Sequence, residues 1–164
     1  MSDDLAIPFE WTEAHEQTRE RDAKDVVRVG MVVSRTMPLS VFNGLFVAGF
    51  YPDQIAVLMK CSADTVMKWA RRPVSAPSDN ITKAYPKLVG ILQEMEFQLS
   101  QALANEQADE ARWRPRLNYM RDQLARSYQQ VGQYTSYKSA SPEYQNKVYD
   151  FREQVRRDYV FVFR

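Results

Sequence analysis

The sequence contains few of the residues from which metal and catalytic sites are usually built. Its 164 residues include one cysteine, one histidine and five glycines. These counts exclude an internal disulfide framework, a zinc site of the usual ligands and a glycine-rich loop around a phosphate. No apolar run approaches the roughly 18 residues that a membrane span requires, and the acidic start is unlike a signal peptide. We expect a cytoplasmic protein that is not an enzyme, needs no cofactor and contacts no membrane.

The charges are distributed unevenly, although the net charge is only +1. Residues 1–25 carry a net charge of −5, residues 50–87 of +3 and residues 113–164 of +5. An acidic arm followed by basic segments fits a nucleic-acid surface that is kept clear of the arm. The same pattern fits solvent-exposed helix faces, and charge alone favours this simpler interpretation.

The first half of the chain predicts an extended arm over residues 1–11 and a helix over about 12–34. The β-branched second half of that segment leaves a short strand as an alternative. Three short helices are then predicted from glycine, proline and serine at helix ends, and they cover residues 39–48, 52–59 and 63–72. The proline-containing segment 73–79 is a predicted linker.

The second half of the chain predicts a helical hairpin. Apolar residues recur at steps of four and three in two series, namely Leu88, Leu92, Met95, Leu99 and Ala102, then Trp113, Leu117, Met120, Leu124, Tyr128 and Val131. Such seams belong to helices that pack on other helices. Pro115 is expected in the first turn of its helix, because within the interior it removes a hydrogen bond. If the hairpin stands apart from the preceding helices, oligomerisation has to cover the seams.

The end of the chain predicts one more helix and a strand. Residues 132–141 form a loop, and Ser141 followed by Pro142 marks a helix start. The last run, Tyr159–Phe163, is strand-like and an aggregation risk as a free edge. It is expected to pair with another segment or with the same segment of a neighbouring subunit.

Residues 54–72 carry the features of a helix-turn-helix. In the first helix, Ile55, Ala56 and Met59 supply an apolar inner face with a small residue at the crossing point. Lys60 and Cys61 form a tight turn, and Ser62 caps the second helix. A recognition helix needs one buried stripe and one polar face that fits the major groove. Here the buried stripe is Val66, Trp69 and Ala70, and the polar face is Asp64, Thr65, Lys68 and Arg71.

These residues predict a DNA-binding surface. The hydroxyls of Ser62 and Thr65 and the helix N-terminus are suited to phosphate contact, while the basic side chains add positive charge. The predicted DNA-binding residues are Gln54, Ser62, Asp64, Thr65, Lys68, Arg71 and Arg72. A three-helix core that binds protein through a similar turn is the alternative.

Two other groups of residues favour structural roles. Glu94 and Glu96 are two positions apart, so they do not share a helix face and form no carboxylate pair. Eight of the nine tyrosines follow residue 80. They could stack on bases, but their spacing along the helix seams favours packing.

Together the elements predict a mainly all-α fold. It consists of an N-terminal helix-turn-helix domain, an antiparallel helical hairpin, and a C-terminal helix with a short terminal β-strand. The predicted segments are an N-terminal arm and helix (1–37), the helix-turn-helix domain (38–72), the linker (73–79), a hairpin for oligomerisation (80–135) and the C-terminal helix and strand (136–164).

The segment resembles helix-turn-helix motifs in which Ile-Ala precedes a Leu-Gly-Val turn, a Ser cap, a Thr-Val pair and a Trp. The matching residues are Ile55, Ala56, Ser62, Thr65, Val66 and Trp69. Lys60 departs from the pattern, which has a left-handed Gly in the turn. Because a left-handed Lys costs roughly 1 kcal/mol, we expect a differently shaped turn.

The order of parts over residues 39–164 resembles the small terminase subunit of tailed bacteriophages, and residues 41–56 are similar to its DNA-binding region. The resemblance implies a ring of identical chains, about nine of them, with helix-turn-helix domains on the rim and a C-terminal strand that joins a barrel. It also implies a non-catalytic role in viral DNA packaging, in the host-cell cytoplasm. The implied partners are double-stranded DNA, further copies of the chain and the large, ATP-hydrolysing terminase subunit.

Two other functions remain open from the sequence. One is a dimeric transcriptional regulator joined by the hairpin, with two recognition helices one DNA turn apart. The other is a helical structural or assembly protein whose helix-turn-helix binds protein. The DNA sequence recognised and the number of subunits do not follow from the residues.

Overall fold

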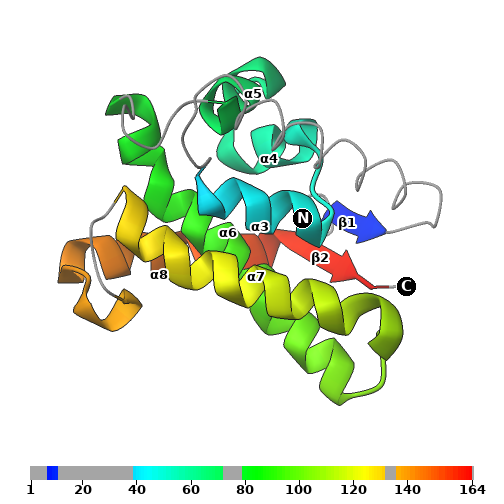
Figure 1. The fold of residues 1–164 in the computed structure, drawn as a ribbon. Helices are drawn as coiled ribbons and strands as arrows, with labels where there is room; N and C mark the ends of the chain where they lie inside the picture. Colours follow the sequence, from blue (N-terminus) through cyan, green and yellow to red (C-terminus); the bar gives the residue numbers. More distant parts are fainter. Residues whose placement is uncertain (1–6, 11–38, 72–78, 132–135, 164) are drawn as a thin grey trace.

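The computed structural model describes residues 7–10, 39–71, 79–131 and 136–163 and is mostly helical (Figure 1). Within these ranges the chain forms six α-helices, one 3-10 helix and two short strands. The expectation of a mainly helical fold is therefore confirmed. The predictions for most of the arm, for the helix over 12–34 and for most of the linker fall outside the described residues.

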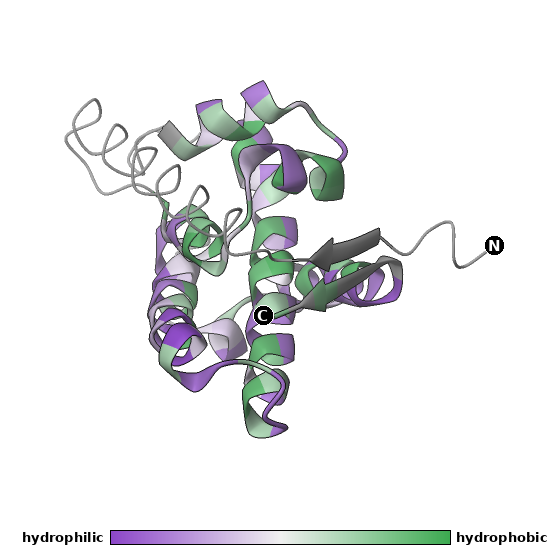
Figure 2. Ribbon diagram, turned by 90° about the vertical axis from the view of Figure 1, so that its right-hand side faces the viewer, coloured by the Kyte–Doolittle hydropathy of each residue, from purple (hydrophilic) through white to green (hydrophobic). Residues whose placement is uncertain are grey.

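The central element of the fold is α6 (Asp79–Ala104), which forms an antiparallel hairpin with α7 (Glu110–Gln130). One side of this hairpin is covered by α3 (Ser40–Ala48), which lies along α7 and also contacts α6 (Figure 1). Another side of α6 is covered by α8 (Pro142–Asp158). Hydrophobic residues gather where the helices face one another (Figure 2).

The two predicted seams are covered within one chain. All five predicted seam residues on α6 are buried in a single hydrophobic core with α3 and α8, as are Trp113, Leu117, Met120 and Tyr128 of the second seam. Leu124 and Val131 are partly buried against this core. Oligomerisation was expected to cover the seams only if the hairpin stood apart from the preceding helices. In the structure the hairpin does not stand apart, because α3 packs against it. The contacts between α3 and α7 also cross the predicted boundary between 38–72 and 80–135, and that division stays a prediction.

The prediction for Pro115 is wrong. The side chain of Asp109 accepts a hydrogen bond from the Arg112 backbone N–H (2.9 Å), so α7 begins at Glu110 and Pro115 lies in its interior. The early start places Trp113 in the core. The capping bond and the burial of a tryptophan outweigh the one backbone hydrogen bond that the proline removes.

The two ends of the described chain lie side by side. Strand β1 (Ile7–Glu10) pairs in parallel with β2 (Tyr159–Val162), with Ile7 opposite Tyr159 (Figure 1). The ring of Phe161 packs edge-on against Phe50, with centroids 5.7 Å apart, and Phe163 packs against Trp113 at 5.2 Å. The C-terminal run thus contacts both another strand and the helical core of the same chain.

The described tyrosines differ in exposure. Tyr85, Tyr128 and Tyr144 are buried, as expected of packing residues, whereas Tyr119 and Tyr149 are exposed. Burial raises the pKa of Tyr128 to about 12, and its hydroxyl accepts a hydrogen bond from Gln93 Nε2 at 2.8 Å. The phenol of Tyr128 is therefore neutral at physiological pH and has a structural role.

Among the described helices, no single one has both the length and the hydrophobicity to cross a membrane. The only combination that passes on length and composition is α3 together with α4 (Pro52–Met59), and these two are bent by 111° at their junction.

A buried carboxylate joins α6 to α8. Glu94 is fully buried (0% exposed), and its Oε1 accepts hydrogen bonds from Arg152 Nε (3.0 Å) and Arg156 Nη2 (3.1 Å). Gln98 Nε2 donates to the other oxygen at 2.6 Å.

One turn earlier on α6, a Cβ at Gly90 would lie 2.9 Å from the Val148 carbonyl oxygen, so this glycine permits the close approach of α8.

This role of Glu94 was not predictable from the sequence. The spacing of Glu94 and Glu96 correctly indicated that they are not a pair, since Glu96 bonds Arg121 on α7 instead. The partners of Glu94 lie 58 and 62 positions further along the chain. Periodicity within one helix carries no information about such distant partners.

We expect Glu94→Gln to lower the free energy of unfolding by about 2–3 kcal/mol, because two guanidinium groups lose the charge that compensates them in a buried site. Urea denaturation followed by circular dichroism measures the change. Glu153→Gln is the control, since Glu153 bonds Arg156 on the surface, and its loss should stay below about 0.5 kcal/mol. Equal losses in both variants would contradict a special role for the buried carboxylate.

Candidate nucleic-acid interface

The predicted DNA-binding segment forms two short helices in contact, α4 and α5 (Ala63–Arg71). Pro52 occupies the first position of α4, and the Tyr51 backbone N–H donates to Gln54 Oε1 at 2.9 Å. The Ser62 hydroxyl accepts from the Thr65 backbone N–H at 3.1 Å, as expected of a residue that caps α5. Local capping signals in the sequence therefore located both helix starts correctly.

The turn between α4 and α5 is left-handed at Lys60, with φ 56° and ψ 47°. The expectation of a differently shaped turn is wrong, because Lys60 adopts the conformation for which related motifs use glycine. Backbone hydrogen bonds to the end of α4 hold it there: the Lys60 N–H donates to the Val57 carbonyl (3.3 Å) and the Cys61 N–H to the Ala56 carbonyl (3.0 Å). These bonds satisfy carbonyls that the helix end would otherwise leave unpaired.

The apolar stripe of α5 faces the core. Val66 and Ala70 are buried, and Trp69 and Met67 are partly buried against the core. On α4 the buried side consists of Ile55, Ala56 and Leu58. The stripe thus fixes the orientation of α5 about its own axis and decides which residues reach solvent.

Four of the predicted DNA-binding residues share the outer face of α5. Ser62, Asp64 and Lys68 are exposed, and Thr65 is partly exposed. Gln54 lies on α4, where its side-chain oxygen is used in the helix-starting bond to Tyr51. The side chain of Arg71 and the whole of Arg72 lie outside the described residues.

The outer face of α5 carries opposite charges. Lys68 Nζ lies 3.2 Å from Asp64 Oδ2, and the two side chains are 78% and 77% exposed. A pair this exposed contributes little to stability, because water screens it and its long side chains lose freedom. Its effect is on the surface field, since the acid cancels the positive charge that Lys68 would offer to DNA. Asp64 and Lys68 are four positions apart, a spacing at which side chains on a helix can pair. The net charge of the segment does not show this pairing.

The hydroxyls predicted to contact phosphate already have partners in the chain. Ser62 Oγ and Thr65 Oγ1 lie 2.8 Å apart and share a hydrogen bond, in addition to the bond from the Thr65 backbone. Asp64 adds a negative charge beside them at the start of α5. The structure thus brings Ser62 and Thr65 together, but as a capping pair beside an acid and not as a vacant phosphate site.

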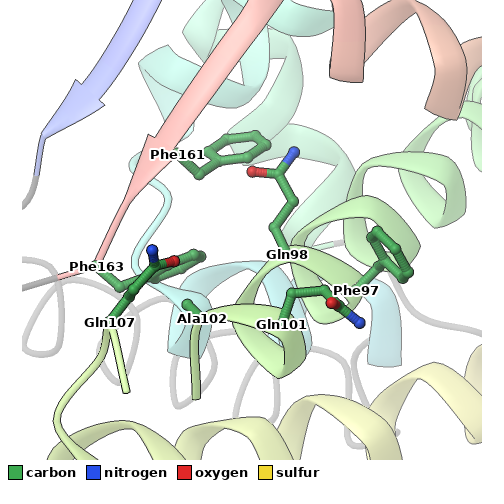
Figure 3. Close-up of a pocket in the computed structure, with 7 residues that line it drawn as sticks. All are labelled: Phe97, Gln98, Gln101, Ala102, Gln107, Phe161 and Phe163. Carbon is green, nitrogen blue, oxygen red and sulfur yellow. The ribbon is translucent and has the colours of Figure 1, made fainter. Parts of the chain in front are cut away.

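A hollow of about 380 Å³ lies elsewhere, between α6 and the end of the chain (Figure 3). Phe161 and Phe163 line it from the C-terminal side, and the remaining lining residues are Phe97, Gln98, Gln101, Ala102 and Gln107. None of these seven side chains is an acid, a base or a nucleophile. The hollow therefore offers no group for proton transfer or covalent catalysis.

The described residues near the outer face of α5 determine whether this face could react covalently or bind a metal ion. Burial raises the pKa of the Cys61 thiol above its ordinary value, so Cys61 stays protonated near neutral pH. Among the described residues no cluster of three histidine, cysteine or acidic side chains could hold a metal ion. The chemistry available on this face is hydrogen bonding and charge, which suits recognition. Comparison with protein-family models, with curated proteins and with solved structures finds no match for this chain.

We expect Lys60→Gly to be about 1 kcal/mol more stable than Lys60→Ala, because only glycine adopts the left-handed turn without a Cβ penalty. Thermal and urea unfolding of the two variants measure the difference, and both remove the same charged side chain. A Lys60→Ala variant as stable as Lys60→Gly would show that the left-handed turn is not held in solution.

Proposed function

We propose that α4 and α5 form a helix-turn-helix that binds double-stranded DNA, with α5 entering the major groove. The observation that carries this is the division of α5 into a stripe anchored by Val66 and Ala70 and an outer face of polar and charged side chains. A recognition helix needs this combination, because its inner side must fix the angle at which its outer side meets base edges. The sharp turn at Lys60 supports the same interpretation.

We further propose that the chain is the DNA-recognition subunit of a viral packaging machine, similar to the small terminase subunit. Support comes from the order of parts, in which a helix pair precedes a larger helical body and a C-terminal strand. On the described part of the outer face of α5, Asp64 offsets the charge of Lys68, so one copy is expected to bind DNA weakly. Several copies in a ring raise the effective concentration of the second and later contacts, which turns weak binding into useful affinity. The bound DNA then passes to a large, ATP-hydrolysing partner, and this chain performs no catalysis itself.

A second candidate function is protein binding through the same helix pair. Two observations favour it: Val57 on α4 is 54% exposed, and Asp64 neutralises Lys68 on α5. An exposed apolar side chain on one helix and an internally paired set of charges on the other also suit a protein partner. DNA binding separates the two functions directly.

We expect Lys68→Ala combined with Arg71→Ala to weaken binding to duplex DNA at least tenfold, and to reduce the slope of log affinity against log salt by about one. Fluorescence anisotropy with a labelled duplex at two or more salt concentrations measures both. The control is Lys138→Ala combined with Lys147→Ala, which removes the same charge from exposed positions outside α5. Unchanged binding in the first variant would end the assignment of α5 as recognition helix.

The native mass of the particle tests the packaging role. A ring of about nine copies has about nine times the chain mass of 19.1 kDa. Native mass spectrometry, or light scattering after size exclusion, gives the value. A dimer would instead favour a transcriptional regulator, and a monomer would contradict both assemblies.

A further inference from the structure

We propose that Asp64 is the residue that makes α5 selective, because it holds Lys68 away from phosphates and itself accepts a hydrogen bond from a cytosine. This inference rests on the proposed DNA binding and assigns the chemistry of that same face. It concerns which duplexes bind, whereas the proposed function concerns whether duplexes bind at all.

The geometry of the pair permits an exchange of partners. Asp64 and Lys68 are one helical turn apart, their charged atoms are 3.2 Å from one another, and more than three quarters of each side chain is exposed. Because water already solvates both groups, breaking the pair has a small cost. A base edge that satisfies both groups can therefore replace the ion pair, while a ligand that satisfies only one of them gains little.

A phosphate satisfies only the lysine. It would draw Lys68 away and leave the Asp64 carboxylate next to the negatively charged backbone, where like charges repel. The usual compensation at a helix start is also reduced, since Ser62 and Thr65 bond one another and the Thr65 N–H is capped. The described side chains on the outer face of α5 thus form no phosphate clamp of the kind that gives tight binding to any sequence.

Base edges in the major groove can satisfy both groups. A carboxylate accepts from the exocyclic N4 amino group of cytosine, and a lysine donates to O6 or N7 of guanine. Asp64 therefore favours a cytosine at the point where its side chain enters the groove. Lys68 lies one turn further along α5 and favours a guanine within its reach. Adenine N6 is also a donor, but acceptors flank it on both sides, N7 of adenine and O4 of the paired thymine, and these repel the carboxylate.

The test compares wild type with Asp64→Asn on two kinds of duplex. A selection from random duplexes with full-length wild type first defines a preferred site, and affinities for that site and for random duplex are then measured. We expect Asp64→Asn to bind random duplex several-fold more tightly, with a salt slope steeper by about one. We expect the ratio of site to random affinity to fall at least tenfold.

The control is Glu143→Gln on α8. Glu143 and Lys147 form the same i, i+4 pair at the same 3.2 Å distance, so the variant makes an identical change in net charge outside α5. Thermal unfolding confirms that both variants are folded. An unchanged affinity ratio in Asp64→Asn, or equal weakening on both duplexes, would overturn the selectivity assignment and leave DNA binding intact. Failure of wild type to bind any duplex would overturn the proposed function itself, and the inference with it.

Discussion

The burial of α6 on every side is the constraint from which the rest of the fold follows. All residues from Leu88 to Met95 are buried, so the helix needs neighbours around its whole circumference. One of those residues is a carboxylate, and a charge removed from water must be compensated in place. Arg152 and Arg156 provide this and fix α8 against α6. The chain leaves α8 directly into β2, whose Phe161 meets Phe50 just before α4. The position of the candidate recognition helix thus depends on packing far from it.

Local signals predicted the short helices, and hydrogen bonds at helix ends explain two of the failures. Pro52 and Ser62 mark helix starts through their own backbone chemistry, so the sequence located α4 and α5 well. The conformation of Lys60 and the place of Pro115 were mispredicted because each violates a local preference that neighbouring hydrogen bonds outweigh. The seam on α6 identified one buried face and missed the others. Periodicity in a sequence reveals a difference in hydrophobicity between the faces of a helix. A helix segment that is buried on all its faces shows little of this difference.

The candidate site was predictable in its residues and not in its electrostatics. Spacing alone indicated which side chains share the outer face of α5. It did not indicate that Ser62 and Thr65 bond one another, or that Asp64 engages Lys68, because a charge count treats each group separately. A face with such internal pairing is poorly suited to strong binding by one copy. Under the proposed function, recognition would depend on how many copies act together and on the match between α5 and the bases.

The parallel pairing of β1 with β2 has a consequence for how the protein is made. Its partners Ile7 and Tyr159 are far apart in the sequence, and every described helix lies between them. These helices are synthesised before β2 and have the opportunity to fold during translation. The small sheet can therefore form only after β2 has been synthesised, and it then joins two distant segments of the polypeptide.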